Sequence, residues 1–202
     1  MKVLINSTTA FIGGGVQVGV SFAKYIFNNN PGFDFIFAIS KPIYDNLPEH
    51  IKIDPRIKVF EVSPSKIFKG KKARKRIREI ENSFKPDFIY SMAFPSYVRF
   101  KTKEIGRYTN PWEIFKAEKA WSLLSTKEKV LRSLKNSYRL YWAARAEFYE
   151  TQTVSAKNAI SKKFNCKKEK IFVSPNVLNP LFENITIEEP PQPEEVTQDE
   201  TD

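Results

Sequence analysis

Short apolar runs alternate with stretches of helical periodicity along most of this chain. The runs predict strands at residues 2–6, 33–40, 56–62, 86–92, 104–109, 149–155 and 169–175. Between them, apolar positions recur at helical spacing over residues 16–27, 66–84, 125–149 and 155–164. Strands that alternate with helices are typical of a parallel sheet covered on both faces. The pattern therefore predicts an α/β fold, a single Rossmann-like domain whose first strand lies inside a parallel sheet between helices.

The predicted helices differ in how much of their surface they should bury. Residues 66–84 carry only a thin apolar stripe, which indicates an exposed amphipathic helix. Ser125 and Glu128 form a capping-box pattern at the start of the long helix, and Ser155 is the predicted cap of the next one. Four aromatic residues at helical spacing are predicted to belong to the core: Tyr138, Tyr141, Trp142 and Phe148.

Length and composition indicate one globular domain over residues 1–182. The last 20 residues are rich in Glu and Pro, so we expect residues 183–202 to be an acidic, disordered tail. Because this tail holds eight of the 23 acidic groups and no Lys or Arg, residues 1–182 carry a net charge of +18. Such a charge indicates an anionic partner. The single cysteine, Cys166, and the absence of a signal-peptide pattern indicate a cytoplasmic protein, with a membrane surface as a further location.

Three consecutive glycines, Gly13, Gly14 and Gly15, separate the first predicted strand from the first predicted helix. This is where α/β folds bind phosphates, because free backbone N–H groups and the helix dipole point there. The dinucleotide and P-loop fingerprints both fail, since Val18 replaces a required glycine and Val20-Ser21 replaces Lys-Ser/Thr. A tight turn remains one interpretation. A loop that contacts an anionic or sugar ligand is the other, because one glycine would suffice for the turn.

Three segments in order carry a resemblance to a known family. They are "GGGVQVGVSFAKYI", "KPDFIYSMAFPSYVRFKTKEIGRYTNPWEIF" and "YETQTVSAKNAISKKFNCKKEKIFVSPNVLN". Over residues 1–182 the chain resembles the N-terminal half of glycosyltransferases with the GT-B fold, most closely glycosyltransferase family 4. The resemblance implies a retaining transfer of sugar from a nucleotide-diphosphate donor, without a cofactor or bound metal, in a cleft between two domains.

The resemblance also implies roles for individual residues. The donor-phosphate loop would be Gly13, Gly14, Gly15 and Gln17, and Asn176 would lie at the crossover to a second domain. Tyr108 stands where many family members have a histidine, and Val177 replaces a glycine. The donor-binding domain would lie outside this sequence, so we expect the chain alone to be inactive. It would be half of a split enzyme that needs a second polypeptide, or the product of a shortened gene.

Aromatic and polar side chains of the middle segment provide the candidates for sugar binding. Sugars are held by aromatic faces and by polar groups at the rim of an apolar cleft. The acceptor-side candidates are Arg107, Tyr108, Asn110 and Trp112, with core packing as the alternative for Trp112. Glu113 and Tyr108 are the candidate catalytic residues, Glu113 because it is the carboxylate best placed for acid–base work.

Eight Lys and Arg residues lie between Lys66 and Arg78. They predict either a solvated helix face or docking on an anionic membrane. The candidate docking residues are Lys69, Lys71, Lys72, Arg74, Lys75 and Arg76. No stacking or base-reading motif accompanies this charge, so nucleic acid is the weakest of the anionic partners. The alternative to an enzyme domain is a non-catalytic module that binds sugar or an anionic membrane.

Overall fold

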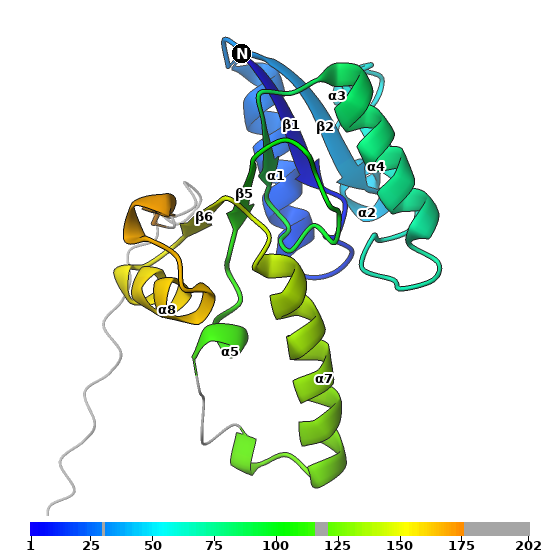
Figure 1. Ribbon diagram of the computed structural model, residues 1–202. Helices are drawn as coiled ribbons and strands as arrows, with labels where there is room; N and C mark the ends of the chain where they lie inside the picture. The colour runs from blue at the N-terminus through cyan, green and yellow to red at the C-terminus, as the bar shows by residue number, and fades with distance from the viewer. Residues whose placement is uncertain (30, 116–120, 176–202) are drawn as a thin grey trace, which may run out of the picture.

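The computed structural model describes residues 1–29, 31–115 and 121–175. Seven parallel strands form one sheet in the order β3-β2-β1-β4-β5-β6-β7 (Figure 1). The strands are β1 (Lys2–Ser7), β2 (Asp34–Ser40), β3 (Ile57–Phe60), β4 (Phe88–Ser91), β5 (Glu104–Arg107), β6 (Phe148–Thr151) and β7 (Ile171–Val173). Each predicted strand is present, and β1 lies inside the sheet between β2 and β4. The prediction of a Rossmann-like α/β domain is confirmed.

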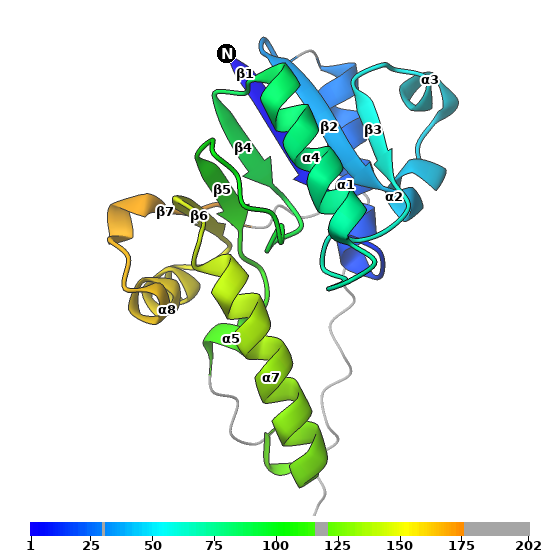
Figure 2. The ribbon, with the colours of Figure 1, turned by 45° about the vertical axis from the view of Figure 1, so that its right-hand side comes forward.

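Helices lie on both faces of this sheet. They are α1 (Gly14–Asn28), α2 (Lys41–Asp45), α3 (Glu49–Lys52), α4 (Lys71–Phe84), α5 (Pro111–Ile114), α7 (Thr126–Ala143) and α8 (Val154–Phe164), with a 3₁₀ turn at Lys168–Lys170. In Figure 2, α4 lies in front of β1 and β2 while α1 lies behind them. From β1 the chain adds β2 and then β3 on one side of β1. It then crosses back and adds β4 on the other side of β1. The strand order therefore reverses between β1 and β4.

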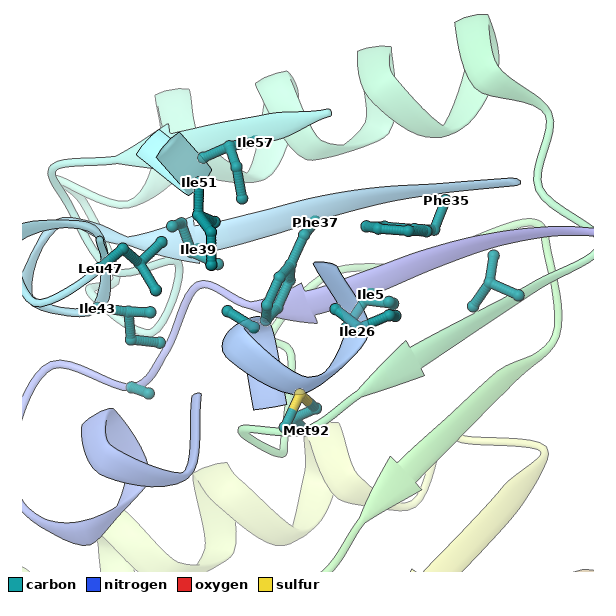
Figure 3. Close-up of a cluster of buried hydrophobic side chains, with 13 residues drawn as sticks. Ile5, Ile26, Phe35, Phe37, Ile39, Ile43, Leu47, Ile51, Ile57 and Met92 are labelled. Carbon is teal, nitrogen blue, oxygen red and sulfur yellow. The ribbon is translucent and has the colours of Figure 1, made fainter. Parts of the chain in front are cut away.

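The central strands are apolar on both sides because both faces of the sheet are covered. Val3, Ile5 and Phe37 alternate with Leu4 and Ala38 along β1 and β2, and all five are buried. The first three belong to the cluster under α1 (Figure 3), and the other two pack with Ile77 and Ile80 of α4. Near-continuous burial of this kind is what a parallel sheet between two helical layers requires.

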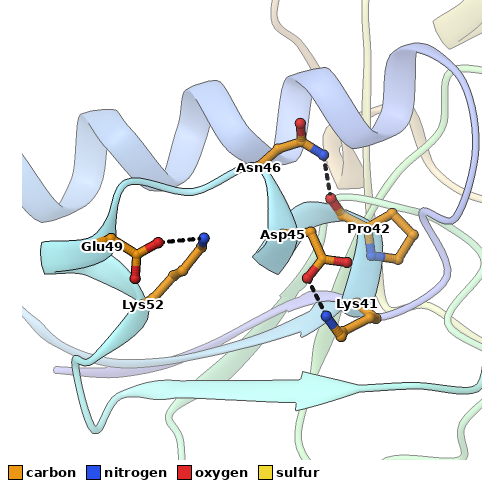
Figure 4. A network of polar contacts seen from close by, with 6 residues as sticks. All are labelled: Lys41, Pro42, Asp45, Asn46, Glu49 and Lys52. Atoms are coloured by element: carbon orange, nitrogen blue, oxygen red, sulfur yellow. Dashed lines mark hydrogen bonds and ion pairs between the residues drawn. The ribbon is translucent and has the colours of Figure 1, made fainter.

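The short helices α2 and α3 were not predicted. Their polar sides make local contacts only: an ion pair joins Lys41 to Asp45, Asn46 Nδ2 donates to the Pro42 carbonyl at 2.8 Å, and Lys52 Nζ lies 2.8 Å from Glu49 Oε1 (Figure 4). Their apolar sides supply Ile43, Leu47 and Ile51 to the core. These three residues recur every four positions, which is helical spacing, but the two helices have only five and four residues and Pro48 separates them, so neither is long enough to be marked by a periodicity of its own.

Three predicted helix boundaries were wrong. The helix predicted from residue 66 begins at Lys71, because residues 63–70 form a turn in which the Gly70 N–H donates to the Lys66 carbonyl at 2.9 Å. The cap of α8 is Thr153 rather than Ser155, since the Thr153 hydroxyl accepts from the Ala156 N–H at 3.1 Å. The capping box at Ser125 is confirmed, but α7 ends at Ala143 and residues 148–151 form β6.

The long helix α7 departs most from the predicted packing. It extends away from the sheet in both views (Figures 1 and 2), and Ala143 is its only buried residue among those that the structure describes. Leu134 is 64% exposed and Tyr141 is 48% exposed. None of the four aromatic residues predicted to be core is buried: Tyr138, Trp142 and Phe148 are half-buried and Tyr141 is exposed, so that prediction was wrong. The inner end is held by stacking of Tyr138 on Tyr97, with ring centroids 5.5 Å apart.

Candidate functional site

A cleft of about 760 Å³ lies at the carboxyl edge of the sheet. The residues that follow β1, β4, β5, β6 and β7 all contribute to it, and the amino end of α1 forms one wall. Its lining includes Ser7, Thr9, Gly14, Gly15, Met92, Ala93, Phe94, Tyr97, Arg107, Thr109, Arg139, Gln152 and Ser174. In open α/β sheets, ligands bind at this edge, where the strand order reverses.

The three glycines of the loop before α1 are not equivalent. Gly13 has φ of 65°, a left-handed conformation that side chains rarely adopt, so the turn itself requires this glycine. Gly14 and Gly15 do not have a positive φ. A Cβ on Gly14 would meet no atom within 4 Å, and one on Gly15 would meet only Ala10 Cβ at 3.6 Å. Neither the turn nor packing requires Gly14 and Gly15, and both line the cleft.

The amino end of α1 is open to a ligand. Its cap, Gly13, makes no side-chain hydrogen bond, and the first turn of the helix contains no acidic residue. The first N–H groups of a helix have no partner within the helix and carry a partial positive charge. This end of α1 therefore offers unshared donors to an anion in the cleft.

Two arginines provide the charge of the cleft, and each is backed by a carboxylate. Arg107 is the last residue of β5, and its Nε lies 3.6 Å from Glu150 Oε1. Arg139 comes from the inner part of α7 and forms an ion pair with Glu113. The Glu113 side chain is 1% exposed and lies deeper than Arg139 at 35%, whereas Glu150 at 15% and Arg107 at 18% are buried to a similar degree. Glu150 also accepts a hydrogen bond from the Tyr90 hydroxyl.

Glu113, the candidate acid–base residue, accepts two hydrogen bonds and forms one ion pair. Tyr108 Oη donates to Glu113 Oε2 at 2.6 Å, Asn110 Nδ2 donates to Oε1 at 2.7 Å, and Arg139 is the partner in the ion pair. Burial and the hydrogen bond to Glu113 raise the pKa of Tyr108, so its hydroxyl stays protonated and keeps donating. This geometry favours a role for Tyr108, Asn110 and Glu113 in orienting Arg139.

A chain of buried polar groups runs beneath the cleft through three neighbouring strands. Thr8 Oγ1 donates to Asn6 Oδ1 at 2.7 Å, Asn6 Nδ2 donates to Ser91 Oγ at 3.2 Å, and Ser91 Oγ donates to Glu104 Oε1 at 2.6 Å. Burial raises the pKa of Glu104 to about 7, against the hydrogen bonds from Ser91 and Ser96 that lower it, while the charge of Glu81 raises it further. The chain fixes the loop after β1, from which Thr9 lines the cleft.

The structure brings some of the predicted site residues together and separates others. Gly14, Gly15 and Arg107 line the same cleft. Tyr108 is buried behind it, and Gln17 is exposed on α1 outside the lining. Asn176 and the predicted tail at 183–202 lie outside the described residues, as does the side chain of Trp112. The roles assigned to all these residues stay predictions.

Sequence reasoning missed Arg139, Thr109, Gln152 and Ser174, which complete the lining. Thr109, Gln152 and Ser174 were placed inside the predicted strands 104–109, 149–155 and 169–175, whereas the observed strands β5, β6 and β7 end before them. Strand ends that were predicted too late therefore hid these residues, although sites lie beyond the carboxyl ends of strands. Arg139 gives no such signal, because it lies among several basic residues of a long helix.

The basic residues at 69–76 form two groups. Lys69, Lys71, Lys72 and Lys75 are exposed, and Lys75 pairs with Glu79 at 3.7 Å. The guanidinium of Arg74 donates to the carbonyls of Pro64, Lys66 and Ile67 and so stabilises the turn before α4. Arg76 donates to the Val59 carbonyl at 2.8 Å and lies over the Phe60 ring. Only the four lysines are therefore free of structural contacts to the backbone.

The described residues contain neither a helix that could span a membrane nor a cluster of metal-binding side chains. Over residues 1–29, 31–115 and 121–175, no helix combines the length and apolar character that crossing a membrane needs. The same residues contain no group of three or more His, Cys, Asp or Glu side chains that could hold a metal ion.

No protein-family model matches this sequence, and no curated protein matches it either. Solved structures do match the fold. One is described as a UDP-N-acetylglucosamine 2-epimerase from Listeria monocytogenes, with a TM-score of 0.54 and 16% identity over 91% of this chain and 50% of that chain. Another, described as a UDP-N-acetylglucosamine 2-epimerase, has a TM-score of 0.50 and 13% identity over 90% of this chain and 51% of that chain.

These likenesses concern the fold. The chain spans about half the length of the two structures that it matches. Both have a GT-B-like fold, and the seven-stranded parallel sheet between helices is consistent with one Rossmann-like half of such a fold. The class defined by the architecture is therefore a GT-B-type α/β domain, while family 4 is not singled out among enzymes with this fold.

Proposed function

We propose that this chain is the acceptor-side domain of a retaining glycosyltransferase that uses a nucleotide-sugar donor. One observation carries the proposal: Gly14 and Gly15 are required neither by the turn nor by packing, yet both line the cleft beside an uncapped helix end. Glycine at such a place lets a ligand approach the backbone N–H groups closely. A diphosphate is a ligand of the right charge for this place, because the helix end carries a partial positive charge and the described lining contains no acidic residue.

Two further facts support a nucleotide-sugar enzyme. The structures with the matching fold are described as enzymes that act on UDP-N-acetylglucosamine. The sequence resemblance to glycosyltransferase family 4 runs over the segments that form this cleft. Within the proposal the second half of the cleft comes from another domain or polypeptide, so the 202-residue chain binds nucleotide without turnover.

Nucleotide binding tests the proposal directly. We expect the 202-residue chain to bind UDP weakly, and Gly14→Val to lower its affinity about tenfold or more by removing charge-assisted contacts to backbone N–H groups. The free space around Gly14 means that this variant should still fold. Titration calorimetry measures the affinity, and release of nucleotide diphosphate from nucleotide sugars measures turnover.

Ser21→Val is the matched control, because Ser21 is exposed on the same helix and does not line the cleft. Unchanged UDP binding in Gly14→Val would contradict the proposed loop. Turnover by the chain alone that is lost in Gly14→Val would show that the single domain is already an enzyme.

A second candidate function is docking on an anionic membrane, as a peripheral protein. The turn before α4 exposes Ile67 and Phe68, which are 60% and 89% exposed, beside Lys66, Lys69 and Lys71. Apolar side chains inserted at the headgroup boundary and basic groups near anionic lipids both favour such binding.

Charge reversal tests this docking. Changing Lys69, Lys71, Lys72 and Lys75 to Glu should abolish most binding to vesicles of phosphatidylcholine and phosphatidylglycerol in a sedimentation assay. Binding of the unchanged chain should fade with salt, since exposed charges are screened beyond about 8 Å at physiological ionic strength. Arg74 is left intact because its loss would disrupt the turn.

The control reverses Lys162, Lys163, Lys167 and Lys168, which are exposed at the other end of the chain and change the net charge equally. An equal loss of binding in both variants would assign the effect to net charge rather than to this surface.

A further inference from the structure

The two arginines of the cleft share an arrangement that the proposed diphosphate loop does not explain. Both Nε atoms are buried, and each lies against one largely buried carboxylate, that of Glu150 for Arg107 and that of Glu113 for Arg139. Among the described residues, neither guanidinium donates a hydrogen bond from its Nη groups to the protein. A guanidinium held from behind in this way keeps its outer donors for a ligand.

The surroundings of both arginines are built to keep them in place. Tyr90 donates to Glu150 behind Arg107, and Tyr108 and Asn110 donate to Glu113 behind Arg139. The two carboxylates therefore receive hydrogen bonds from these donors and do not need the Nη groups of the arginines. Holding the planar fork in advance reduces the conformational entropy that binding would otherwise cost.

The rest of the lining matches an anion with several oxygens. It contains no acidic residue among those that the structure describes, and it offers the hydroxyls of Thr109 and Ser174 and the amide of Gln152. Burial raises the pKa of Tyr97, which also lines the cleft, to about 12, so its hydroxyl is a neutral donor at physiological pH.

We propose that Arg107 and Arg139 form a second anion site, which binds a phosphate group on the acceptor. The proposal rests on the function proposed above and names its acceptor class: a phosphorylated molecule rather than a neutral sugar. The donor diphosphate would occupy the end of α1, and the acceptor phosphate would lie between the two guanidinium groups. Arginine forks bind phosphate oxygens in pairs, which gives orientation as well as affinity.

The experiment uses two probes on the 202-residue chain, UDP for the glycine loop and glycerol 3-phosphate for the arginine pair, with glycerol as the neutral control. Amide shifts of isotope-labelled protein report both affinities. We expect Arg107→Gln and Arg139→Gln each to weaken glycerol 3-phosphate binding about tenfold or more, since each removes charge-assisted hydrogen bonds. The UDP affinity should change much less, and Gly14→Val should show the opposite pattern.

Two variants separate loss of the site from loss of folding. Arg107→Gln combined with Glu150→Gln leaves no unpaired buried carboxylate, and Arg139→Lys keeps the charge but loses the fork. Both should fold, and both should still bind glycerol 3-phosphate more weakly than the parent chain. Binding of a short-chain phosphatidic acid tighter than that of glycerol 3-phosphate would assign the phosphate to a lipid acceptor, and equal binding to a soluble one.

The outcomes separate this proposal from the proposed function. In one outcome UDP binding depends on Gly14, but glycerol 3-phosphate binding is the same with and without either arginine. This result would overturn the second anion site and leave the proposed function in place. Glycerol 3-phosphate binding through the arginines without any UDP binding would support the site and overturn the function. Equal losses of both probes in the arginine variants would overturn the site, since the arginines would then hold the donor diphosphate.

Discussion

The free energy of unfolding is expected to fall by about 3 kcal/mol as the pH rises because of Glu104, and replacing Glu104 with glutamine should abolish this fall. Burial raises the pKa of Glu104 to about 7 in the folded chain, from 4.5 for an unperturbed glutamate. Between these two values the folded state keeps a proton that the unfolded state has released. Stability therefore falls as the pH rises from about 4.5 to 7, and it changes no further from this group above pH 7.

Urea unfolding at pH 5 and pH 8 measures this effect. Glu104→Gln mimics the protonated carboxyl and can still accept from Ser91, so its stability should match that of the parent chain at pH 5 and exceed it at pH 8. The charged groups around Glu104 are Glu81 on α4 and, along the surface hollow that Glu104 lines, Arg99, Lys101, Lys103, Arg145 and Glu147. Glu79→Gln, at an exposed position of α4, controls for the lost charge. The prediction would be contradicted if the free energy of unfolding fell equally from pH 5 to pH 8 in Glu104→Gln and in the parent chain.

Replacing Phe37 with alanine should lower the free energy of unfolding by about 3–5 kcal/mol, through lost apolar burial and the cavity left behind. Phe37 is fully buried at the centre of β2, next to Ile5 and Ile57 in the neighbouring strands. It also meets the edge of Phe22 on α1, with ring centroids 6.0 Å apart. The midpoint of urea unfolding, monitored by circular dichroism, reports the loss.

Phe172→Ala is the matched control for Phe37→Ala. Phe172 lies on the edge strand β7, is 51% exposed and packs mainly on Phe148. The same chemical change there should cost about 1 kcal/mol or less, because little area leaves water on folding. Similar losses at both positions would show that the core around α1 is looser than its packing indicates.

The central part of the fold could be predicted because short runs of consecutive residues there indicate how each residue is buried. Val3, Leu4 and Ile5 can be buried consecutively only in a strand covered on both faces. Tyr141 could not be placed in the same way, since aromatic residues at helical spacing indicate a buried stripe but not which surface would bury it. The helix α7 has the pattern of a packed helix and leaves much of its apolar face exposed.

The candidate site likewise contains some residues that could be predicted from local sequence and others that could not. Gly14 and Gly15 could be proposed from sequence because they follow a predicted strand, and Arg107 because it lies in the carboxyl half of another, the end at which α/β folds place their sites. Arg139 and its carboxylate are 26 positions apart, and Glu104 reaches Ser91 and Asn6 only because β1, β4 and β5 are neighbours. Local sequence patterns do not specify which strands are neighbours. Polar networks that cross several strands therefore cannot be predicted until the strand order is known.

The exposure of α7 also determines how thermal fluctuations spread through the domain. Its outer turns make few tertiary contacts, so their helical state depends on the capping box of Ser125 and Glu128 and on helix propensity, which are weak by themselves. Its inner turns are fixed by the buried Ala143 and by the stacking of Tyr138 on Tyr97. Arg139 lies on the fixed side of this division, so fraying of the outer turns can proceed without displacing the guanidinium from the cleft.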